Sequence, residues 1–204
     1  MKTKVWDFWA KRYKKLWVQK YSLKPTREMI KNLLIQNEYN NKSLLDIGCG
    51  VGQLLYEISS LDSINLYGLD FSKEMIEESK KLNPDVTHFQ LDVEDMLSIG
   101  LKFDYITCTH SFPYYTNKKQ VLSKIFQLLE KDGKLFISFA SGDSYFDKLI
   151  LFFVKFTTGY ATYPSDIEFR SLIEGLYLVE NSEIIKEKFY MPRIVVYSLK
   201  KVKE

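Results

Sequence analysis

The segment LLDIGCGVGQLL, at residues 44–55, restricts the possible folds of this chain more than any other stretch. Its apolar start is typical of a buried strand, its three glycines of a tight turn, and its end of the first turn of a helix. In open α/β sheets such a turn lies at the carboxyl edge, where nucleotide-like ligands bind. The segment therefore predicts an α/β fold with a ligand site at the turn. It leaves open whether that ligand carries a phosphate.

Strand and helix patterns alternate five times along the chain. This alternation favours an open, mostly parallel, doubly wound sheet with right-handed crossovers and helices on both faces. The last two strands follow one another without a helix, so we expect an antiparallel hairpin at one edge and a seven-stranded mixed sheet. The expected strands are residues 43–47, 64–70, 86–92, 103–110, 134–140, 176–189 and 191–202.

Local signals predict where several helices begin. Pro25 suits the first turn of a helix that runs to about residue 36. Asn117, followed by Gln120, predicts an N-cap, and Ser165 with Glu168 has the spacing of a capping box. Further helices are expected at residues 3–20, 51–60, 72–82, 94–97 and 143–156.

The chain of 204 residues is long enough for one α/β domain with small additions. We expect a single domain over residues 1–204, made of an N-terminal helical cap at 1–37, a cofactor-binding core at 43–140, a possible lid or substrate segment at 143–174 and a hairpin at 176–201.

The remaining composition indicates a cytoplasmic protein. The two cysteines are interpreted as reduced thiols, although a disulfide between them is conceivable, and no Cys/His cluster has metal-ligand spacing. The longest apolar run, at residues 149–154, is far short of a membrane span, and no signal peptide is recognised.

The glycine spacing separates two kinds of ligand only weakly. Gly48, Gly50 and Gly52 form G-x-G-x-G, whereas the dinucleotide pattern G-x-G-x-x-G needs a third glycine at the position of Gln53. One glycine motif alone is weak evidence, so this mismatch does not exclude a dinucleotide.

Three acidic residues at successive strand ends define the ligand better. Asp46 lies two residues before the first glycine, where a carboxylate would repel a pyrophosphate and attract an ammonium group. Asp70 ends the second expected strand and can accept the hydroxyls of a ribose, while Asp92 ends the third and can accept the amine of an adenine. Each acid alone could equally be a helix N-cap or a loop charge. Together they indicate a ligand with an ammonium, a ribose and an adenine.

These motifs resemble those of the class I S-adenosylmethionine-dependent methyltransferases, in particular the small-molecule, type 11-like members, over nearly the whole chain. The first motif of that family, D-x-G-x-G-x-G, is matched by DIGCGVG at residues 46–52. The resemblance continues through LYGLDFSKEMIEESKK, FQLDVEDM, FDYITCTHSFPYY and LLEKDGKLFISF, with Lys131-Asp132-Gly133 in place of the usual Pro-Gly-Gly. It implies a Rossmann-like fold, S-adenosylmethionine as cofactor and methyl transfer by in-line displacement at the sulfonium.

The resemblance also implies roles for individual residues. The methionine part of the cofactor would contact Asp46, Gly48, Cys49 and Gly50, the ribose Asp70, the adenine Phe71, Asp92 and Val93, and the reactive end Thr109 and His110, while Tyr13 in the N-terminal helix would cover the cofactor.

The methyl acceptor is less well defined by the sequence. His110, just past the fourth strand, is the best candidate for a general base, although it could instead pack beside the cofactor or bind a backbone carbonyl. His88, inside the third strand, is interpreted as structural. The loop SFPYY departs from the (D/N/S)-P-P-(Y/F) motif of enzymes that methylate amino groups of nucleic acids, which lowers the case for a DNA or RNA acceptor.

Aromatic residues favour a small, apolar or aromatic acceptor. Residues 144–163 hold seven aromatics in twenty positions and predict either a lid over such a substrate or a hydrophobic cluster at the sheet edge. The expected substrate pocket combines His110, Phe112, Tyr114, Tyr115, Tyr145 and Tyr160, although the three aromatics after the fourth strand could instead belong to the core. We expect the N-terminal helix and this segment to close the pocket together.

Three other functions stay open. Residues 1–31 carry a net charge of +8, which allows an RNA methyltransferase, although a solvated helix face paired with the acidic body explains the charge as well. A nicotinamide-dependent oxidoreductase shares the fold and Asp70. A non-enzymatic sensor that keeps the cofactor pocket is the third alternative.

Overall fold

The computed structural model of the chain describes residues 6–7, 22–158, 160–186, 188 and 191–202. Within these residues the core is a seven-stranded sheet of order β3-β2-β1-β4-β5-β7-β6. The first five strands run parallel and β7 runs antiparallel to both of its neighbours, as expected. The strands are β1 (Lys42–Ile47), β2 (Ile64–Asp70), β3 (Thr87–Gln90), β4 (Phe103–Thr109), β5 (Leu129–Ala140), β6 (Tyr177–Ile185) and β7 (Ile194–Lys201).

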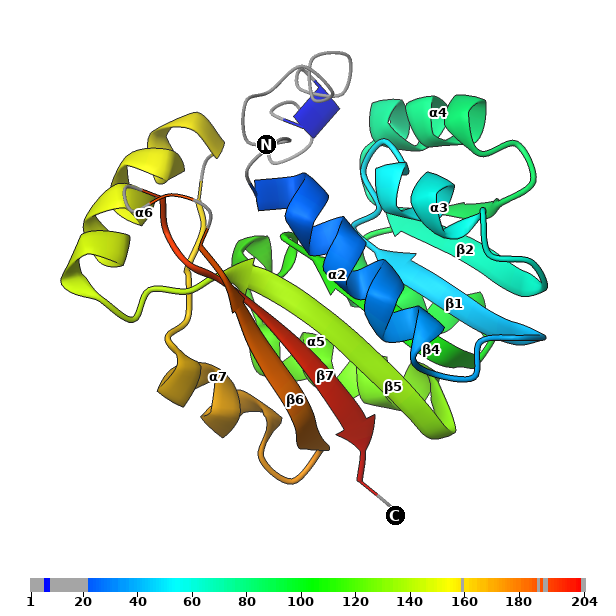
Figure 1. Cartoon of the computed structure of the whole chain (residues 1–204). Helices are drawn as coiled ribbons and strands as arrows, with labels where there is room; N and C mark the ends of the chain where they lie inside the picture. The colour runs from blue at the N-terminus through cyan, green and yellow to red at the C-terminus, as the bar shows by residue number, and fades with distance from the viewer. Residues whose placement is uncertain (1–5, 8–21, 159, 187, 189–190, 203–204) are drawn as a thin grey trace.

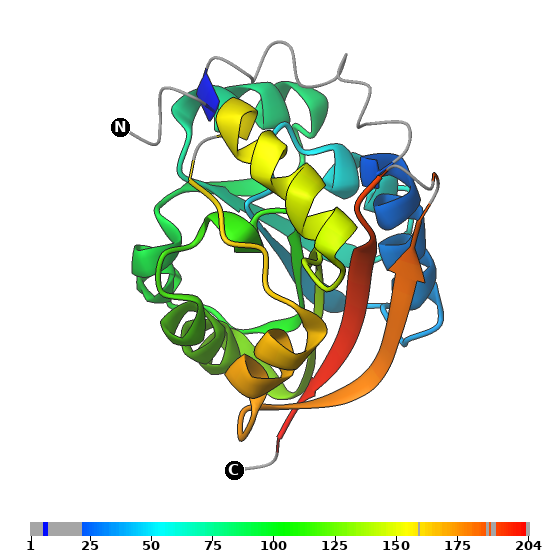
Figure 2. The same ribbon diagram turned by 90° about the vertical axis from the view of Figure 1, so that its left-hand side faces the viewer.

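Helices cover both faces of the sheet, as the alternation predicts. Figures 1 and 2 show α2 and α3 over one face and α5 over the other. The first face buries Ile30, Leu34 and Leu55 against the sheet, and the second buries Leu122, Ile125 and Phe169. The helices are α2 (Lys24–Ile35), α3 (Gln53–Ile58), α4 (Lys73–Leu82), α5 (Lys118–Leu128), α6 (Tyr145–Thr158) and α7 (Asp166–Ile173), with 3-10 turns η3 (Val93–Ile99) and η4 (Phe112–Tyr114).

The expected helix starts are confirmed. Pro25 lies in the first turn of α2. The Asn117 side chain accepts a hydrogen bond from the Gln120 N–H, and Ser165 and Glu168 form the reciprocal capping box of α7. The expected helix at residues 3–20 falls almost wholly outside the described residues.

Several strand ends differ from the expectation. β5 begins at Leu129 and not at residue 134, so the turn expected at Asp132-Gly133 lies within the strand, and β6 ends at Ile185 and not at residue 189. The third strand stops at Gln90 and not at residue 92, because the Leu91 N–H bonds to the Asp70 carbonyl and Asp92 then caps η3. The last strand begins at Ile194 and not at residue 191, because Pro192 has no N–H and the Arg193 N–H donates to Asp147. The sheet is therefore shorter at its ligand-binding edge than the apolar pattern indicates.

The carboxyl ends of the parallel strands point toward one end of the molecule. Residues 6–7 and α6 lie at that end, whereas the C-terminus lies at the opposite end (Figures 1 and 2). Among the helices that the structure describes, none is long and apolar enough to cross a membrane.

Candidate functional site

The glycine turn after β1 has a backbone that only glycine adopts without strain. Gly48, Gly50 and Gly52 have φ of 71°, 53° and 74°. A Cβ on Gly48 would lie 2.5 Å from the Cβ of Ser111, so a side chain there would displace the loop after β4. The N–H groups of Gly48 and Cys49 both donate to the Leu69 carbonyl, at 2.7 and 3.0 Å, which fixes the turn against the end of β2. The turn is therefore held in one conformation between the end of β2 and the loop after β4.

Asp46 is a buried carboxylate with one hydrogen-bond donor. It is 1% exposed, and its Oδ1 accepts from the Thr107 hydroxyl at 2.7 Å. The pKa of Asp46 is raised to about 7, mainly by burial; the bond from Thr107 opposes the rise and the nearby charge of Asp70 adds to it. A carboxylate in this condition is stabilised by an added cation, which fits the ammonium group of the implied cofactor.

Asp70, at the end of β2, bridges the glycine turn and α4. Its Oδ2 accepts from the Gly50 N–H and its Oδ1 from the Ser72 N–H, both at 2.9 Å. Burial raises the pKa of Asp70 to about 6, although the N–H bonds of Ser72 and Gly50 lower it. The carboxylate is thus held in one orientation, as a hydroxyl-accepting group needs to be.

A cavity of about 50 Å³ lies between the glycine turn and α2. Its lining brings together six of the expected site residues, namely Asp46, Gly48, Cys49, Gly50, Thr109 and His110. It also contains residues that the sequence did not assign to the site, namely Leu23, Arg27, Val51, Gln53 and Leu54. Arg27 is 9% exposed and binds Glu57 through its Nε at 2.8 Å. The only sequence signal for Arg27 was its position in the basic N-terminal stretch.

His110 joins the end of β4 to α2. Its φ is +59°, uncommon outside glycine, and its N–H donates to the Ser138 carbonyl at 2.8 Å. The ring Nε2 lies 3.0 Å from the Thr26 Oγ1. The pKa of His110 is lowered to about 4, mainly by burial and also by the charge of Arg27. The imidazole is therefore neutral at physiological pH.

The three residues expected around the adenine differ in exposure. Phe71 is half-buried. Val93 is 9% exposed and packs in the larger core cluster. Asp92 is exposed, and its Oδ1 accepts from the Glu94 N–H at 3.0 Å as a helix cap. One of its two carboxylate oxygens therefore already accepts a hydrogen bond within the protein.

The aromatics after β4 divide into core and surface. Phe112 is fully buried, with its ring 5.5 Å from that of Phe139 and 5.6 Å from that of Phe169, so it belongs to the core and not to an open pocket. Tyr114 and Tyr115 are half-buried, and the Tyr115 hydroxyl donates to Ser111 at 3.0 Å beside the glycine turn.

Trp6 packs against three parts of the site. Its ring lies 5.0 Å from that of Tyr114, edge to face, and it contacts Val51 of the glycine turn and Met75 of α4. The neighbouring Asp7 accepts a hydrogen bond from the Ser72 hydroxyl at 2.6 Å. These contacts agree with a covering role for the N-terminal stretch, but Tyr13, which was expected to provide it, lies outside the described residues.

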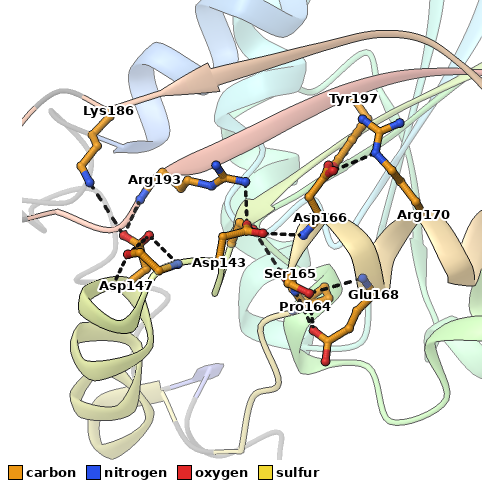
Figure 3. Close-up of polar contacts among 12 residues, drawn as sticks. Asp143, Asp147, Pro164, Ser165, Asp166, Glu168, Arg170, Lys186, Arg193 and Tyr197 are labelled. Carbon is orange, nitrogen blue, oxygen red and sulfur yellow. Dashed lines mark hydrogen bonds and ion pairs between the residues drawn. The ribbon is translucent and has the colours of Figure 1, made fainter.

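The structure does not bring Tyr145 and Tyr160 together with the other expected residues. Tyr145 is 94% exposed and Tyr160 71%, while Leu149, Phe152 and Phe153 on the same segment are also exposed. A polar cluster holds this helix at its amino end: Asp147 accepts from Ser144 and from the Arg193 N–H, and Asp143 pairs with the Arg193 guanidinium at 2.6 Å (Figure 3). We call the outward side of α6, with Tyr145, Leu149, Phe152 and Phe153, the α6 face.

Among the described residues, no group of three or more His, Cys, Asp and Glu side chains is placed to hold a metal ion. Cys49 and Cys108, the two cysteines of the chain, are both free thiols and both buried.

Comparison with known proteins assigns this arrangement to a family. Residues 38–151, more than half of the chain, match the model of a methyltransferase domain. A putative methyltransferase of Invertebrate iridescent virus 6 is 29% identical over 151 residues, covering 68% of this chain and 56% of that protein. The ubiquinone biosynthesis O-methyltransferase of Glaesserella parasuis is 34% identical over 108 residues, 48% of this chain and 44% of that protein. The chain thus spans about half the length of these relatives.

A solved structure has the same fold. The magnesium protoporphyrin IX methyltransferase of Synechocystis, with bound S-adenosylmethionine, superposes with a TM-score of 0.72 at 18% identity, over 91% of this chain and 84% of that one. The strand order, the antiparallel β7 and the D-x-G-x-G-x-G turn all agree with the resemblance inferred from the motifs. The chain therefore belongs to the class I S-adenosylmethionine-dependent methyltransferase family.

Proposed function

We propose that this chain transfers a methyl group from S-adenosylmethionine to a small, apolar or aromatic acceptor. The observation that carries the cofactor half is Asp46. It is a buried carboxylate with a raised pKa that lines one cavity together with the glycine turn. Nothing in a phosphate-binding turn requires a buried acid there, whereas an amino-acid group supplies the cation that such an acid lacks.

The cavity also matches the second charge of an amino-acid group. Arg27 lies in the same lining as Asp46, so that one wall carries a cation and another an anion. We assign the ammonium of the cofactor to Asp46 and its carboxylate to the side of Arg27. The ribose is assigned to Asp70, and the adenine to the segment of Phe71, Asp92 and Val93.

The cofactor supplies an activated methyl group, so the protein mainly has to orient the acceptor and exclude water. Tyr114, Tyr115 and Trp6 surround the outer side of the glycine turn and provide apolar surface there. The α6 face adds exposed aromatic surface at the same end of the molecule (Figure 1). A relative named for ubiquinone biosynthesis and a neighbour named for magnesium protoporphyrin IX support an aromatic acceptor.

The described part of the basic N-terminal stretch does not favour an RNA acceptor. Lys24 pairs with Glu28 at 3.6 Å, Arg27 with Glu57 at 2.8 Å, and Lys31 binds Ser60 at 2.6 Å. Each of these three side chains already has a partner within the fold. The free thiols support a reducing, cytoplasmic location. We further propose that residues 1–204 form one domain and that residues 1–37 are its cap.

Two experiments test the proposed function. In calorimetry, S-adenosylhomocysteine should bind and NAD should not; tight NAD binding with no response to the homocysteine compound would overturn the proposal. In a turnover screen, release of S-adenosylhomocysteine is measured with catechols, aromatic amines and a short RNA as probes. Turnover with RNA alone, lost at high salt, would replace the small-molecule acceptor by RNA.

Deletion of residues 1–20 tests the cap separately. We expect the truncated chain to bind S-adenosylhomocysteine more weakly and to lose turnover, because Trp6 and Asp7 no longer contact the site. Unchanged affinity and turnover would show that the N-terminal stretch takes no part in closing the pocket.

A further inference from the structure

Two consecutive hydrogen bonds connect His110 to the first turn of α2. The Thr26 hydroxyl donates to the Ser22 carbonyl at 2.8 Å. The same oxygen lies 3.0 Å from the Nε2 of His110. A hydroxyl has one proton to donate, and the Thr26 proton is already given to Ser22. The Thr26 oxygen can therefore only accept from His110, and Nε2 must carry the ring proton.

The other ring nitrogen is then an acceptor. A neutral imidazole carries one proton, so Nδ1 holds a lone pair. Within the described residues no hydrogen bond to Nδ1 is formed, and His110 lines the cavity beside Asp46 and Thr109. The other ionisable groups of that lining are unsuited to receive a proton from the acceptor: Arg27 is a cation, burial raises the pKa of the Cys49 thiol so that it stays protonated, and Asp46 is assigned to the ammonium.

The backbone and the ring of His110 are each held by a hydrogen bond. A φ of +59° for a histidine is a strained conformation of the kind found at functional sites. The N–H bond to Ser138 holds it from the side of β5, and Thr26, 84 positions earlier in the chain, holds the ring from the side of α2. Thr26 is fully buried.

We propose that Thr26 is a positioning residue that holds His110 in the Nε2–H tautomer, so that Nδ1 accepts the proton of the incoming methyl acceptor. The inference rests on the proposed function. In the transfer, the acceptor's lone pair forms the new bond to the methyl carbon and the carbon–sulfur pair stays on sulfur. The acceptor's proton passes to Nδ1, and the imidazolium then releases it to solvent. The site thereby selects acceptors whose attacking atom carries both a lone pair and a proton, such as hydroxyls.

Nitrogen NMR of the histidine-labelled protein measures the tautomer directly, because the chain contains only two histidines. A His88→Gln variant assigns the two signals. Wild type should show a protonated Nε2 and an unprotonated Nδ1 for His110, which persists until the pH approaches about 4. Thr26→Ser keeps the hydroxyl and should keep this pattern, whereas Thr26→Val should give a mixture of tautomers. A protonated Nδ1 in wild type, or no change in Thr26→Val, overturns the inference.

Binding of a cofactor analogue measures where Nδ1 points. Sinefungin carries an amine-bearing carbon in place of the methylated sulfur, and that amine can donate to a lone pair at the reaction centre. The ratio of sinefungin to S-adenosylhomocysteine affinity should fall about tenfold in His110→Asn, since one charge-assisted hydrogen bond is lost and asparagine tolerates a positive φ. The ratio should fall in Thr26→Val and recover in Thr26→Ser.

The outcomes separate the two proposals. If neither analogue binds wild type, the proposed function fails. If both bind and the ratio is the same in His110→Asn as in wild type, the function stands and the role of His110 and Thr26 fails. His110→Asn also keeps the test decisive if Thr26→Val does not fold.

Discussion

The glycine turn and the α6 face lie at the same end of the molecule and differ in how they are built. At the turn, two carboxylates are buried, three glycines have positive φ, and the backbone is bonded to the end of β2. On the α6 face, large apolar side chains are exposed, while the only buried carboxylate of the helix, Asp147, points back to the polar cluster at its base (Figure 3). The glycine turn costs free energy because it buries charged groups. The α6 face costs free energy because it exposes apolar side chains to water.

This difference fits two separate binding tasks. The cofactor of the family has charged and polar groups in a constant order, so preformed polar partners bind it at a lower ordering cost. An apolar acceptor is recognised mainly by the surface it covers, so exposed aromatics suffice until it arrives. We therefore expect changes at the turn to act on the cofactor and changes on the α6 face to act on the acceptor alone.

Asp46→Asn should have the largest effect on cofactor affinity, and it tests most clearly the difference between the glycine turn and the α6 face. We expect the affinity for S-adenosylhomocysteine to fall by at least about a hundredfold, because the ammonium loses a buried ionic partner. The unliganded variant should nevertheless melt a few degrees higher, since burial disfavours the charge of Asp46 and the amide can still accept from Thr107.

Asp104→Asn is the matched control for Asp46→Asn. Asp104 lies near the start of β4 and pairs with Lys42 at 2.9 Å. Burial raises the pKa of Asp104, but the hydrogen bonds from Lys42 and Ser43 to its charged form outweigh burial and lower the pKa. This variant should lose stability and keep cofactor affinity. If Asp46→Asn also lost stability, the buried charge would not be the strained element of the site.

Asp70→Ala should weaken cofactor binding by about 1–3 kcal/mol, because it removes a charge-assisted contact to the ribose and frees the N–H groups of Gly50 and Ser72. Asp92→Ala, at an exposed cap, should cost less. Calorimetry on both variants decides the order, and equal losses would contradict the distinction between a buried and an exposed acid.

Cofactor affinity should fall with acidity. The bound ammonium prefers ionised carboxylates, and burial raises the pKa of Asp46 to about 7 and of Asp70 to about 6 in the free protein. Affinity should therefore drop about tenfold from pH 8 to pH 6. Stability of the unliganded protein should run the other way: raised carboxyl pKa values stabilise the fold at low pH, and this contribution is lost as the pH rises through 6 and 7. A flat affinity profile in calorimetry would contradict the role of Asp46.

Phe152→Ser should have the smallest effect. The side chain is 54% exposed, so stability should change by no more than about 0.5 kcal/mol. Cofactor affinity should be unchanged, and the KM of an aromatic acceptor should rise about tenfold, as expected for loss of one apolar contact. Ile167→Ser, at an 80% exposed position on α7, is the control and should leave that KM unchanged. Equal KM values for the two variants would remove the α6 face from the acceptor site.

The sequence predicted the parts of this site that are local in the chain. Asp46, the glycines and Asp70 lie within one strand–turn–helix–strand unit, where periodicity and spacing are informative. Asp92 was placed one element too early, because cap formation ended the strand at Gln90. Thr26 and Trp6 were not recognised as site residues, because their partners His110 and Tyr114 are far away in the sequence and no spacing rule connects them. Phe112 could not be assigned to the core before the fold placed it beside Phe169.

Hydrogen–deuterium exchange with and without S-adenosylhomocysteine tests the central claim most directly. The claim is that the cofactor binds at the glycine turn and the end of β2 without the α6 face, which is left for the acceptor. Added ligand should slow exchange in residues 44–55 and 66–72 and leave residues 145–158 unchanged. Protection of residues 145–158 without protection of residues 44–55 would contradict the account.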